Sequence, residues 1–304
     1  MRIREIESAE LPALVHICRA VRPSDPVSPA DFEDWKRQAE GTIWYLAEGE
    51  DGPAGAGIGV VGWHTPPGRG IVELYTLPEA RGRGAGSALL EGVTSWARAR
   101  DTTELTASVA EDDPASLAWA ARRGFEEIGR NKRVELELTG FDPPSVDPPE
   151  GIEIVQWSVR PGIERGLYAV YCEAEPDIPG EEANELATFE DWLSADMQGV
   201  SDRPEATFAA LAGEEVVGFA KLSILGDAEA TTAYHDLTGV RRAWRGRGIA
   251  GALKRAQIGW AKANGFERLA TANEERNLPI RALNRRYGYR PVPGTITLLA
   301  AIGA

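Results

Sequence analysis

Stretches of β-branched and aromatic residues alternate with turn-forming residues over the first third of the chain. Residues 42–47 and 58–63 are two such stretches, and the turn-forming sequence Asp-Gly-Pro at residues 51–53 separates them, which predicts a hairpin. Residues 71–77 predict a further strand. Before the hairpin, Ser-Pro-Ala-Asp at residues 28–31 combines an N-cap serine, a proline at the first helical position and an acid at the third. A helix is therefore expected to begin there.

The second half of the chain repeats this order of elements. Residues 207–211 and 216–222 flank a turn at residues 212–214, and residues 231–240 predict a strand. In each half the last of these strands leads into a short loop of arginine and glycine and then into an amphipathic helix. The helix of the first half has apolar residues at helical spacing, namely Leu89, Leu90, Val93, Trp96 and Ala97. Strands that alternate with helices predict an α/β (α+β) fold with mixed strand pairing in each half.

The two halves are also related residue by residue. Adding 164 to a position between Arg81 and Gly124 gives its counterpart in the second half, with no insertion. The matched pairs are Arg81 and Arg245, Gly84 and Gly248, Leu89 and Leu253, Trp96 and Trp260, Asp113 and Asn277, and Gly124 and Gly288. A match of this length without gaps indicates two copies of one domain rather than a solenoid of many repeats.

A proline-rich segment separates the two copies. Residues 141–151 contain four prolines among acidic and small residues, which excludes a helix or a central strand and indicates an extended linker. We therefore expect an N-terminal domain at residues 1–140, a linker at residues 141–150 and a C-terminal domain at residues 151–304.

Composition limits the classes of function. Hydrophobic residues make up 43% of the 304 residues, as in ordinary globular domains, and the formal net charge is -14. That charge argues against nucleic-acid binding, which needs an excess of Lys and Arg, and is compatible with a cationic substrate. No apolar stretch reaches the roughly 18 residues that span a bilayer, and no apolar signal region opens the sequence, so we expect a cytoplasmic protein that does not contact membranes. Two cysteines, Cys18 and Cys172, make neither a disulfide framework nor a metal-ligand cluster, and no metal is expected.

The arginine-glycine loop has the chemistry of an anion site. The first N–H groups of a helix are unpaired and carry partial positive charge, so they bind phosphate well. Gly84 and Gly248 remove the Cβ at the point where a pyrophosphate would approach the backbone, and the arginines add charged donors. A P-loop and a dinucleotide fold both fit badly. The chain lacks Gly-Lys-Ser/Thr, and it has no acidic residue at the required place after a strand.

With these loops the chain resembles the GNAT superfamily of acyl-CoA-dependent N-acyltransferases. The pyrophosphate loop of that superfamily, Arg/Gln-x-x-Gly-x-Gly/Ala, is matched by residues 81–86 and again by residues 245–250. A second signature, a strand followed by a helix, is matched by residues 271–289 and by residues 111–125. The resemblance implies two tandem GNAT folds, each a mixed, splayed central sheet flanked by helices, with acetyl-CoA as the acyl donor.

The resemblance also implies which residues hold acetyl-CoA. In the second copy they are Thr238, Val240, Arg245, Gly246, Arg247, Gly248, Ile249, Ala250, Asn273, Asn277 and Asn284, and in the first copy Leu77, Arg81, Gly82, Arg83, Gly84, Ala85 and Gly86. The pantetheine arm is expected between the strand that ends at Val240 and the strand that follows the helix. The implied acceptor is a primary amine of a small molecule, and the protein is expected to be a monomer or a homodimer.

Acetyl transfer needs a base for the attacking amine, a polarised thioester carbonyl and a donor for the leaving thiolate. His235 and Asp236 are the candidate bases on the strand before the second loop, and strand alternation places them on opposite faces. Glu73 is the candidate base in the first copy. Backbone N–H groups near Val240 can polarise the carbonyl without any particular side chain.

The general acid departs from the GNAT pattern. Many GNAT proteins have a tyrosine four residues before the glycine of their closing helix, and this chain has Asn284 and Ala120 at those positions. Tyr287 lies one helical turn after Asn284. It is a candidate acid, with packing against the sheet as its other possible role.

The two copies are expected to be unequal. The first copy has Asp113, Ala120 and Arg123 where the second has Asn277, Asn284 and Tyr287. A carboxylate at position 113 accepts hydrogen bonds but cannot donate them. We therefore expect the second copy to carry out the chemistry. Two alternatives stay open, namely a protein that holds acetyl-CoA without turnover and a transferase for a longer acyl chain.

Overall fold

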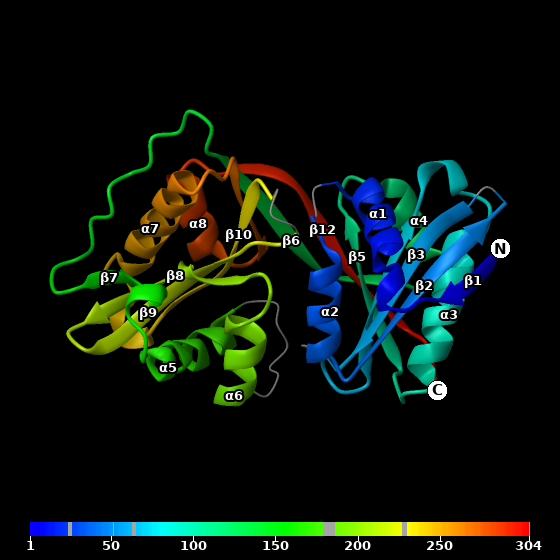
Figure 1. The fold of residues 1–304 in the computed structure, drawn as a ribbon, viewed down its shortest axis with the longest axis horizontal. Helices are drawn as coiled ribbons and strands as arrows, with labels where there is room; N and C mark the ends of the chain where they lie inside the picture. The colour runs from blue at the N-terminus through cyan, green and yellow to red at the C-terminus, as the bar shows by residue number, and fades with distance from the viewer. Residues whose placement is uncertain (24–25, 51, 63–64, 179–185, 227–229, 304) are drawn as a thin grey trace. The chain divides into compact units, whose positions relative to one another are not determined.

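The chain forms two compact units in a computed structural model that describes residues 1–23, 26–50, 52–62, 65–178, 186–226 and 230–303. Unit 1 comprises Met1–Asn131 with Pro293–Ala304, and unit 2 comprises Lys132–Val292. Each unit contains a mixed sheet with helices on both of its faces (Figure 1). The α/β class expected from the alternation of elements is confirmed.

Unit 1 orders its strands as β1-β2-β3-β4-β5-β12. Its elements are β1 (Arg2–Glu5), α1 (Leu11–Val21), α2 (Pro29–Gln38), β2 (Gly41–Gly49), β3 (Gly52–Val61), β4 (Arg69–Thr76), α3 (Ala85–Arg98), β5 (Glu104–Ala110), α4 (Pro114–Ala121) and the end of β12 (Arg290–Ala301). The first four strands pair antiparallel, whereas β4 and β5 pair parallel over three residues each, Arg69–Ile71 with Glu104–Thr106. Within these described strands the parallel pairing stops there, which gives the splayed sheet that was expected.

Unit 2 orders its strands as β6-β11-β10-β9-β8-β7. Its elements are the end of β6 (Glu126–Glu137), β7 (Glu153–Gln156), α5 (Glu164–Ala174), α6 (Phe189–Trp192), β8 (Asp202–Ala212), β9 (Glu215–Ser223), β10 (Thr232–Val240), α7 (Ile249–Ala263), β11 (Arg268–Glu274) and α8 (Leu278–Arg286). The parallel pair β10 and β11 is also short, joining residues 232–234 to residues 268–270. Both copies therefore open at the same place in the sheet.

The last strand of unit 1 comes from the far end of the sequence. Thr295–Ala301 of β12 pair antiparallel with Ala110–Glu104 of β5, so residues from Pro293 onward belong to unit 1. The domain limits expected from the sequence, 1–140 and 151–304, follow chain order and count this strand with the second copy. Backbone pairing with β5, rather than chain order, decides where it lies.

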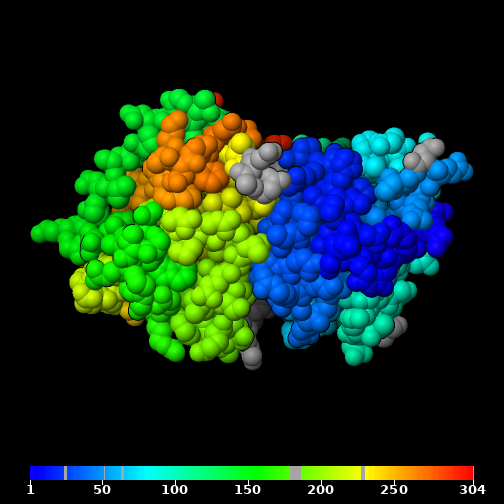
Figure 2. Space-filling model, viewed as in Figure 1, coloured from blue at the N-terminus to red at the C-terminus, as the bar shows by residue number. Residues whose placement is uncertain are grey.

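The proline-rich segment, expected to be an extended linker between the domains, has no regular secondary structure. Residues 141–149 contain no helix or strand and join β6 to β7 inside unit 2. Lys262 Nζ donates to the carbonyl of Leu138 at 2.8 Å, and Arg255 Nη2 donates to that of Asp147 at 2.5 Å. The segment therefore lies along α7 on the surface of unit 2, as the green and orange residues of Figure 2 show.

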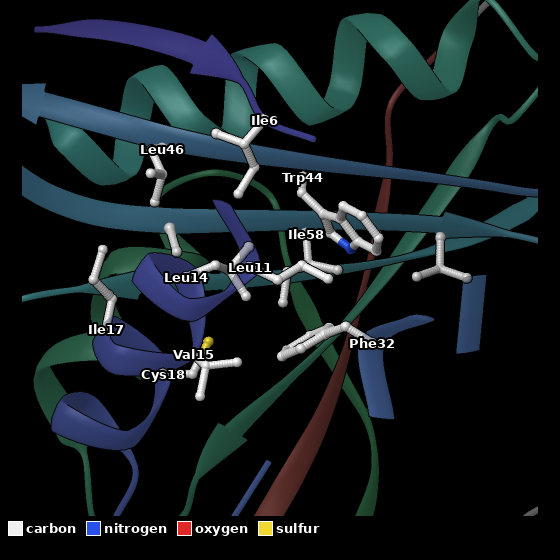
Figure 3. Packing of buried hydrophobic residues seen from close by; sticks show 12 residues of the cluster. Ile6, Leu11, Leu14, Val15, Ile17, Cys18, Phe32, Trp44, Leu46 and Ile58 are labelled. Carbon is white, nitrogen blue, oxygen red and sulfur yellow. The ribbon is translucent and has the colours of Figure 1, made fainter. Parts of the chain in front are cut away.

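The helix start expected at residues 28–31 is confirmed, and it helps to close the core of unit 1. Ser28 is the N-cap of α2, and it exchanges hydrogen bonds with Asp31 in a capping box. Phe32, in the first turn, then points toward Trp44 of β2, with ring centroids 6.5 Å apart (Figure 3). Side chains of α1 complete this cluster on one face of the sheet, while α3 covers the other face. The expected turn residue Asp51 and strand end Trp63 lie outside the described residues.

Unit 2 buries both faces of its sheet in the same way. Leu167 and Val170 of α5 and Trp192 of α6 pack on one face, and Leu253 and Ile258 of α7 pack on the other. Cys18 is buried in unit 1 and Cys172 is half-buried in unit 2, both as free thiols. Over the described ranges, no helix is long and apolar enough to cross a membrane.

Candidate functional site

The two arginine-glycine loops have the same backbone conformation. Gly82 and Gly84 have φ values of 75° and 92°, and Gly246 and Gly248 have values of 76° and 88°. Both helices, α3 and α7, have the second of these glycines as N-cap, and a glycine has no side chain with which to cap the first N–H groups. A Cβ built on Gly82, Gly84 or Gly246 would meet no atom within 4 Å, so open space lies over the loop. The loops are therefore shaped to receive an anion on backbone N–H groups.

The first arginine of each loop fastens the loop to the strand before it. Arg81 Nε donates to the carbonyl of Thr76 at 3.5 Å, and Arg245 Nε donates to that of Val240 at 2.9 Å. In unit 2 the contact is tighter, and Arg245 also pairs with Asp177 at 2.7 Å. Arg245 thus shapes the loop through its own hydrogen bonds, in addition to any contact with phosphate.

Asp177 ties the second loop to the segment that follows α5. Its carboxylate accepts two hydrogen bonds from Arg242, at 2.9 and 3.0 Å, and one from Arg245. These bonds, first from Arg242 and then from Arg245, lower the pKa of Asp177 from 3.8 to about 2. Asp177 therefore stays charged at neutral pH and holds the loop in place.

Basic residues gather in the part of the chain that forms the second loop and the helices around it. Residues 241–290 contain thirteen Lys and Arg against three Asp and Glu, whereas the matching residues 77–126 contain six against eight. The phosphates of CoA are strongly anionic, so the local charge favours their binding in unit 2. The net charge of the whole chain conceals this difference.

The Asp113 and Asn277 positions differ in structure as well as in sequence. Asp113 is the N-cap of α4 and accepts hydrogen bonds from Ser116 N at 3.0 Å and Ser116 Oγ at 2.7 Å. Burial raises the pKa of Asp113, but these bonds and the charge of Arg81 together outweigh it, and the pKa is lowered. Asn277 is the N-cap of α8, yet its side chain caps no backbone N–H. Asn277 is half-buried and available for a ligand, whereas Asp113 is used by its own helix.

Asn284 carries a buried acceptor without a partner. Its Nδ2 donates to Asn273 Oδ1 at 3.0 Å, while its Oδ1 is buried and has no hydrogen-bond partner among the described residues. A buried carbonyl oxygen without a donor is costly, which indicates that a ligand or water supplies one. The counterpart, Ala120, is a buried apolar residue. Asn273 of β11 and Asn284 of α8 lie together beyond the end of the parallel pairing, at the open part of the sheet in unit 2.

Strand β10 contains a bulge that its counterpart β4 lacks. His235 pairs with Leu222 and Thr238 pairs with Ala220, so β10 has one residue more than β9 between these pairs. The register of β4 on β3 continues from residue 70 to residue 76 without a shift. Bulges re-aim side chains and backbone groups and occur often beside active sites. This one lies where β10 leaves β11.

Asp236 and His235 lie on opposite faces of β10, as strand alternation predicts. The side chain of Asp236 is 45% exposed, pairs with Lys221 Nζ at 2.8 Å and accepts a hydrogen bond from Ser223 Oγ at 2.9 Å. Lys221 is buried and also pairs with Asp202 at 3.0 Å. The carboxylates of Asp202 and Asp236 thus share the ammonium of Lys221, and the carboxylate of Asp236 faces solvent.

His235 is enclosed on the α7 side of the sheet. Its Nδ1 is 2.9 Å from Gln257 Oε1, and its Nε2 makes a short hydrogen bond with the hydroxyl of Tyr289. Burial lowers the pKa of His235 well below 6.5, and the nearby charge of Lys254 lowers it further, against a weaker opposing effect of Gln257. His235 is therefore neutral, and both of its ring nitrogens are occupied within the fold.

Tyr287 joins the end of α8 to α7. Its hydroxyl accepts a hydrogen bond from Arg255 Nη1 at 2.8 Å and donates one to the carbonyl of Gly251 at 3.3 Å. These two hydrogen bonds fasten Tyr287 to α7. Both of its candidate roles, general acid and packing against the sheet, stay predictions.

In unit 1 an arginine spans the open part of the sheet. Arg22, the C-cap of α1, donates to Glu73 of β4 at 3.1 Å and to the carbonyl of Ser108 of β5 at 2.5 Å. Tyr75 adds a contact to the Glu73 carboxylate at 3.4 Å. The candidate base of the first copy is therefore held in an internal ion pair. Sequence reasoning missed Arg22 because nothing in its helix pattern indicates a contact so far along the chain.

Comparison with known proteins agrees with this geometry. The model of the acetyltransferase (GNAT) family matches residues 2–125 and, a second time, residues 164–289. The chain belongs to the GNAT family. It is therefore an acyltransferase of the tandem type, as the paired loops indicate. Members of this family generally take the acetyl group from acetyl-CoA, and the open glycine loops and the unpartnered Asn284 oxygen fit that donor.

Individual relatives resemble this chain over most of its length. A mycothiol acetyltransferase of Catenulispora acidiphila is 28% identical over 71% of this chain and 68% of its own length. A GCN5-related N-acetyltransferase of Sphaerobacter thermophilus has a TM-score of 0.77 at 24% identity, over 100% of this chain and 96% of that one. A tandem GNAT protein from the clavulanic acid biosynthesis pathway also has a TM-score of 0.77, at 20% identity, over 100% and 99% of the two chains. The two structures are evidence for the fold.

Proposed function

We propose that this GNAT enzyme transfers an acetyl group from acetyl-CoA to a primary amine of a small molecule, and that unit 2 carries out the reaction. The observation that carries the proposal is the bulge in β10. It lies directly beside Asp236 and at the point where β10 leaves β11. The first copy has the same loop but a regular strand in this position.

The contrast between the copies supports unit 2 as the working unit. In unit 1, Arg22 connects Glu73 and Ser108 across the opening between β4 and β5, where the resemblance puts the end of the pantetheine arm. In unit 2 the corresponding opening borders Asn273 and Asn284, whose amide groups can bond an arm of amide character. Unit 1 has the same arginine-glycine loop, but the side chain of Arg22 lies across its opening between β4 and β5.

Asp236 is the proposed base. Its carboxylate is exposed to solvent on one side and accepts hydrogen bonds from Ser223 and Lys221 on the other, so it is oriented before an acceptor arrives. Asp236 takes a proton from the attacking amine, and the nitrogen is then able to form the new bond to the acetyl carbon. His235 has no such access, because its ring nitrogens are bonded to Gln257 and Tyr289.

Backbone groups of β10 are the proposed polarising groups. From Thr238 to Val240 the strand pairs with β9 on one edge, and β11 no longer pairs with the other edge. N–H groups on that open edge can bond the carbonyl oxygen of the acetyl group without reorganisation. The CoA thiolate that leaves takes a proton from Tyr287 or from water. The variant Tyr287→Phe distinguishes these two donors.

The acceptor proposed is a small, soluble amine. One relative is, by its name, a mycothiol acetyltransferase, which supports a small-molecule acceptor, and the net charge of -14 disfavours nucleic acid or an anionic surface as the acceptor. The oligomeric state, monomer or homodimer, stays a prediction.

The proposal is tested by release of CoA thiol from acetyl-CoA in the presence of a panel of primary amines, including polyamines, amino sugars and aminoacyl amides. Turnover should require an amine, and mass spectrometry should show an acetyl group on its nitrogen. Asp236→Asn should lower turnover by roughly a hundredfold while the affinity for acetyl-CoA is kept.

Glu73→Gln is the matched control, since Glu73 occupies the equivalent strand position in unit 1. Full activity in Asp236→Asn together with loss in Glu73→Gln would assign the chemistry to unit 1. Thiol release that does not depend on any amine would contradict the proposal altogether.

A further inference from the structure

Four polar side chains meet in the interior of unit 2, between β10 and α7. His235 of β10 bonds both Gln257 of α7 and Tyr289, and the ammonium of Lys254 lies 4.8 Å from the centre of the Tyr289 ring. All four residues are buried. In the neutral tautomer that satisfies both contacts, His235 Nδ1–H donates to Gln257 and the Tyr289 hydroxyl donates to Nε2.

Unit 1 has apolar residues at the same four positions. The offset of 164 relates Lys254 to Leu90, Gln257 to Val93 and Tyr289 to Phe125. The strand pairing gives the fourth match. Tyr234 pairs with Ala270 as Ile71 pairs with Thr106, so the next residues, His235 and Val72, are equivalent. The first-copy residues Val72, Leu90, Val93 and Phe125 pack in one hydrophobic cluster.

The polar residues are therefore not required by the fold. An apolar set fills the same space in unit 1, and in unit 2 the buried Nε2 of Gln257 has no hydrogen-bond partner among the described residues. A buried polar group without a partner destabilises a folded chain, and local departures of this kind concentrate at functional sites. Their retention in unit 2 calls for a role other than packing.

We propose that His235, held by Gln257 and Tyr289, is a positioning residue that fixes the bulge of β10 and thereby the direction of Asp236. The inference rests on the proposed function of unit 2. His235 is the last residue before the register shift, and Asp236 follows it directly. Two hydrogen bonds at opposite ends of one ring fix both its position and its rotation, which an apolar side chain does not.

A third contact holds the backbone of the same residue. Thr271 Oγ1 of β11 is 3.4 Å from the carbonyl of His235, at the end of the parallel pairing. Side chain and carbonyl of His235 are thus anchored to α7, to Tyr289 and to β11 where the strands separate. The register shift lies between His235 and Thr238, directly after this anchored residue. The polar set therefore determines that Asp236 is the residue of β10 that faces the acceptor.

The test replaces the polar set by that of unit 1, in the variant His235→Val/Lys254→Leu/Gln257→Val/Tyr289→Phe. This variant should fold, because the apolar set packs in unit 1, and its affinity for acetyl-CoA in calorimetry should stay within about threefold of wild type. Hydrogen exchange of backbone amides in residues 236–240 should become at least about tenfold faster, since the bulge loses its anchor. Trp157→Phe is the control, because it removes another side-chain hydrogen bond of unit 2, from Trp157 Nε1 to Glu164 at 3.0 Å.

Unchanged exchange in residues 236–240 would overturn the proposal, and this readout does not depend on the identity of the acceptor. Should the fourfold variant not fold, Tyr289→Phe alone removes the donor to His235 and keeps the ring. Its exchange should rise in the same segment and not in β8.

Turnover then separates positioning from general stability. With the amine found in the panel, the fourfold variant should lose at least about tenfold in kcat, and it should lose nothing further when Asp236→Asn is already present. Independent losses that multiply would show that the polar set does not act through Asp236. If no amine in the panel is acetylated, the hydrogen exchange of residues 236–240 alone decides the inference. The proposed function and the proposed role of His235 are therefore tested separately.

Discussion

Replacing Lys254 with methionine tests how unit 2 tolerates a titratable group in its interior. The side chain of Lys254 lies between α7 and the sheet, with 1% of the residue exposed, and its ammonium contacts the ring of Tyr289. Burial lowers the pKa of Lys254 from 10.5 to about 7. Methionine has nearly the same length and carries no proton, so the variant removes the titration and little of the packing.

The sign follows from which state holds the proton. Between pH 7 and pH 10.5 the unfolded chain keeps the Lys254 proton and the folded chain has released it, so the stability of the wild type rises with pH in that window. One pKa unit corresponds to about 1.36 kcal/mol, so the two pH units from 7 to 9 give about 2.7 kcal/mol. Below pH 7 both states are protonated and the contribution is constant. Lys254→Met should therefore be more stable than wild type at pH 6, and this advantage should shrink by about 2–3 kcal/mol at pH 9.

Urea denaturation of the full chain at pH 6 and pH 9 measures this difference. Lys254 lies in unit 2, so the substitution changes the free energy of unfolding of that unit. Leu253→Met, a neighbouring buried position of α7 without a charge, should show the same change in stability at both pH values. An advantage of Lys254→Met that stays equal at pH 6 and pH 9 would refute the reasoning, because Lys254 would then hold its proton equally in both states.

Four further substitutions follow from the contrast between the copies. Asp113→Ala should destabilise unit 1 by about 1 kcal/mol in thermal unfolding, because it removes the N-cap of α4, whereas Asn277→Ala should leave stability nearly unchanged and weaken acetyl-CoA binding in calorimetry. Arg22→Ala should open unit 1 and raise the number of acetyl-CoA molecules bound per chain, and an unchanged stoichiometry would contradict that role. Tyr287→Phe should lower kcat more than about tenfold if its hydroxyl is the acid, and should change only stability if it packs.

Much of the fold could be predicted because it depends on local patterns and on the repeat. The helix start at Ser28 follows from N-cap chemistry, and the conformations of Gly84 and Gly248 follow from the loop they open. The placement of His235 and Asp236 on opposite faces follows from strand alternation alone. Each of these is decided by residues close together in the sequence.

The parts that could not be predicted depend on long-range pairing. Backbone pairing with β5, nearly two hundred residues earlier in the chain, decides which unit contains the end of β12. The ion pair of Arg22 with Glu73 links residues 51 positions apart. The polar set around His235 had a signal in the sequence, since Lys254 and Gln257 stand where the first copy has Leu90 and Val93. To recognise the whole set, His235 must be matched with Val72, one residue away from the offset of 164. The sequence does not mark this shift of one residue in β10.

The assignment of the chemistry to unit 2 is tested most directly by disabling one loop at a time. Arg81→Ala/Gly84→Val and Arg245→Ala/Gly248→Val remove the same loop arginine and crowd the same left-handed glycine, whose φ values are 92° and 88°, so each variant is the matched control of the other. Amine acetylation should persist in the first variant and be lost in the second, with both proteins folded by circular dichroism. Loss of acetylation in the first variant and its persistence in the second would place the reaction in unit 1 and contradict the account.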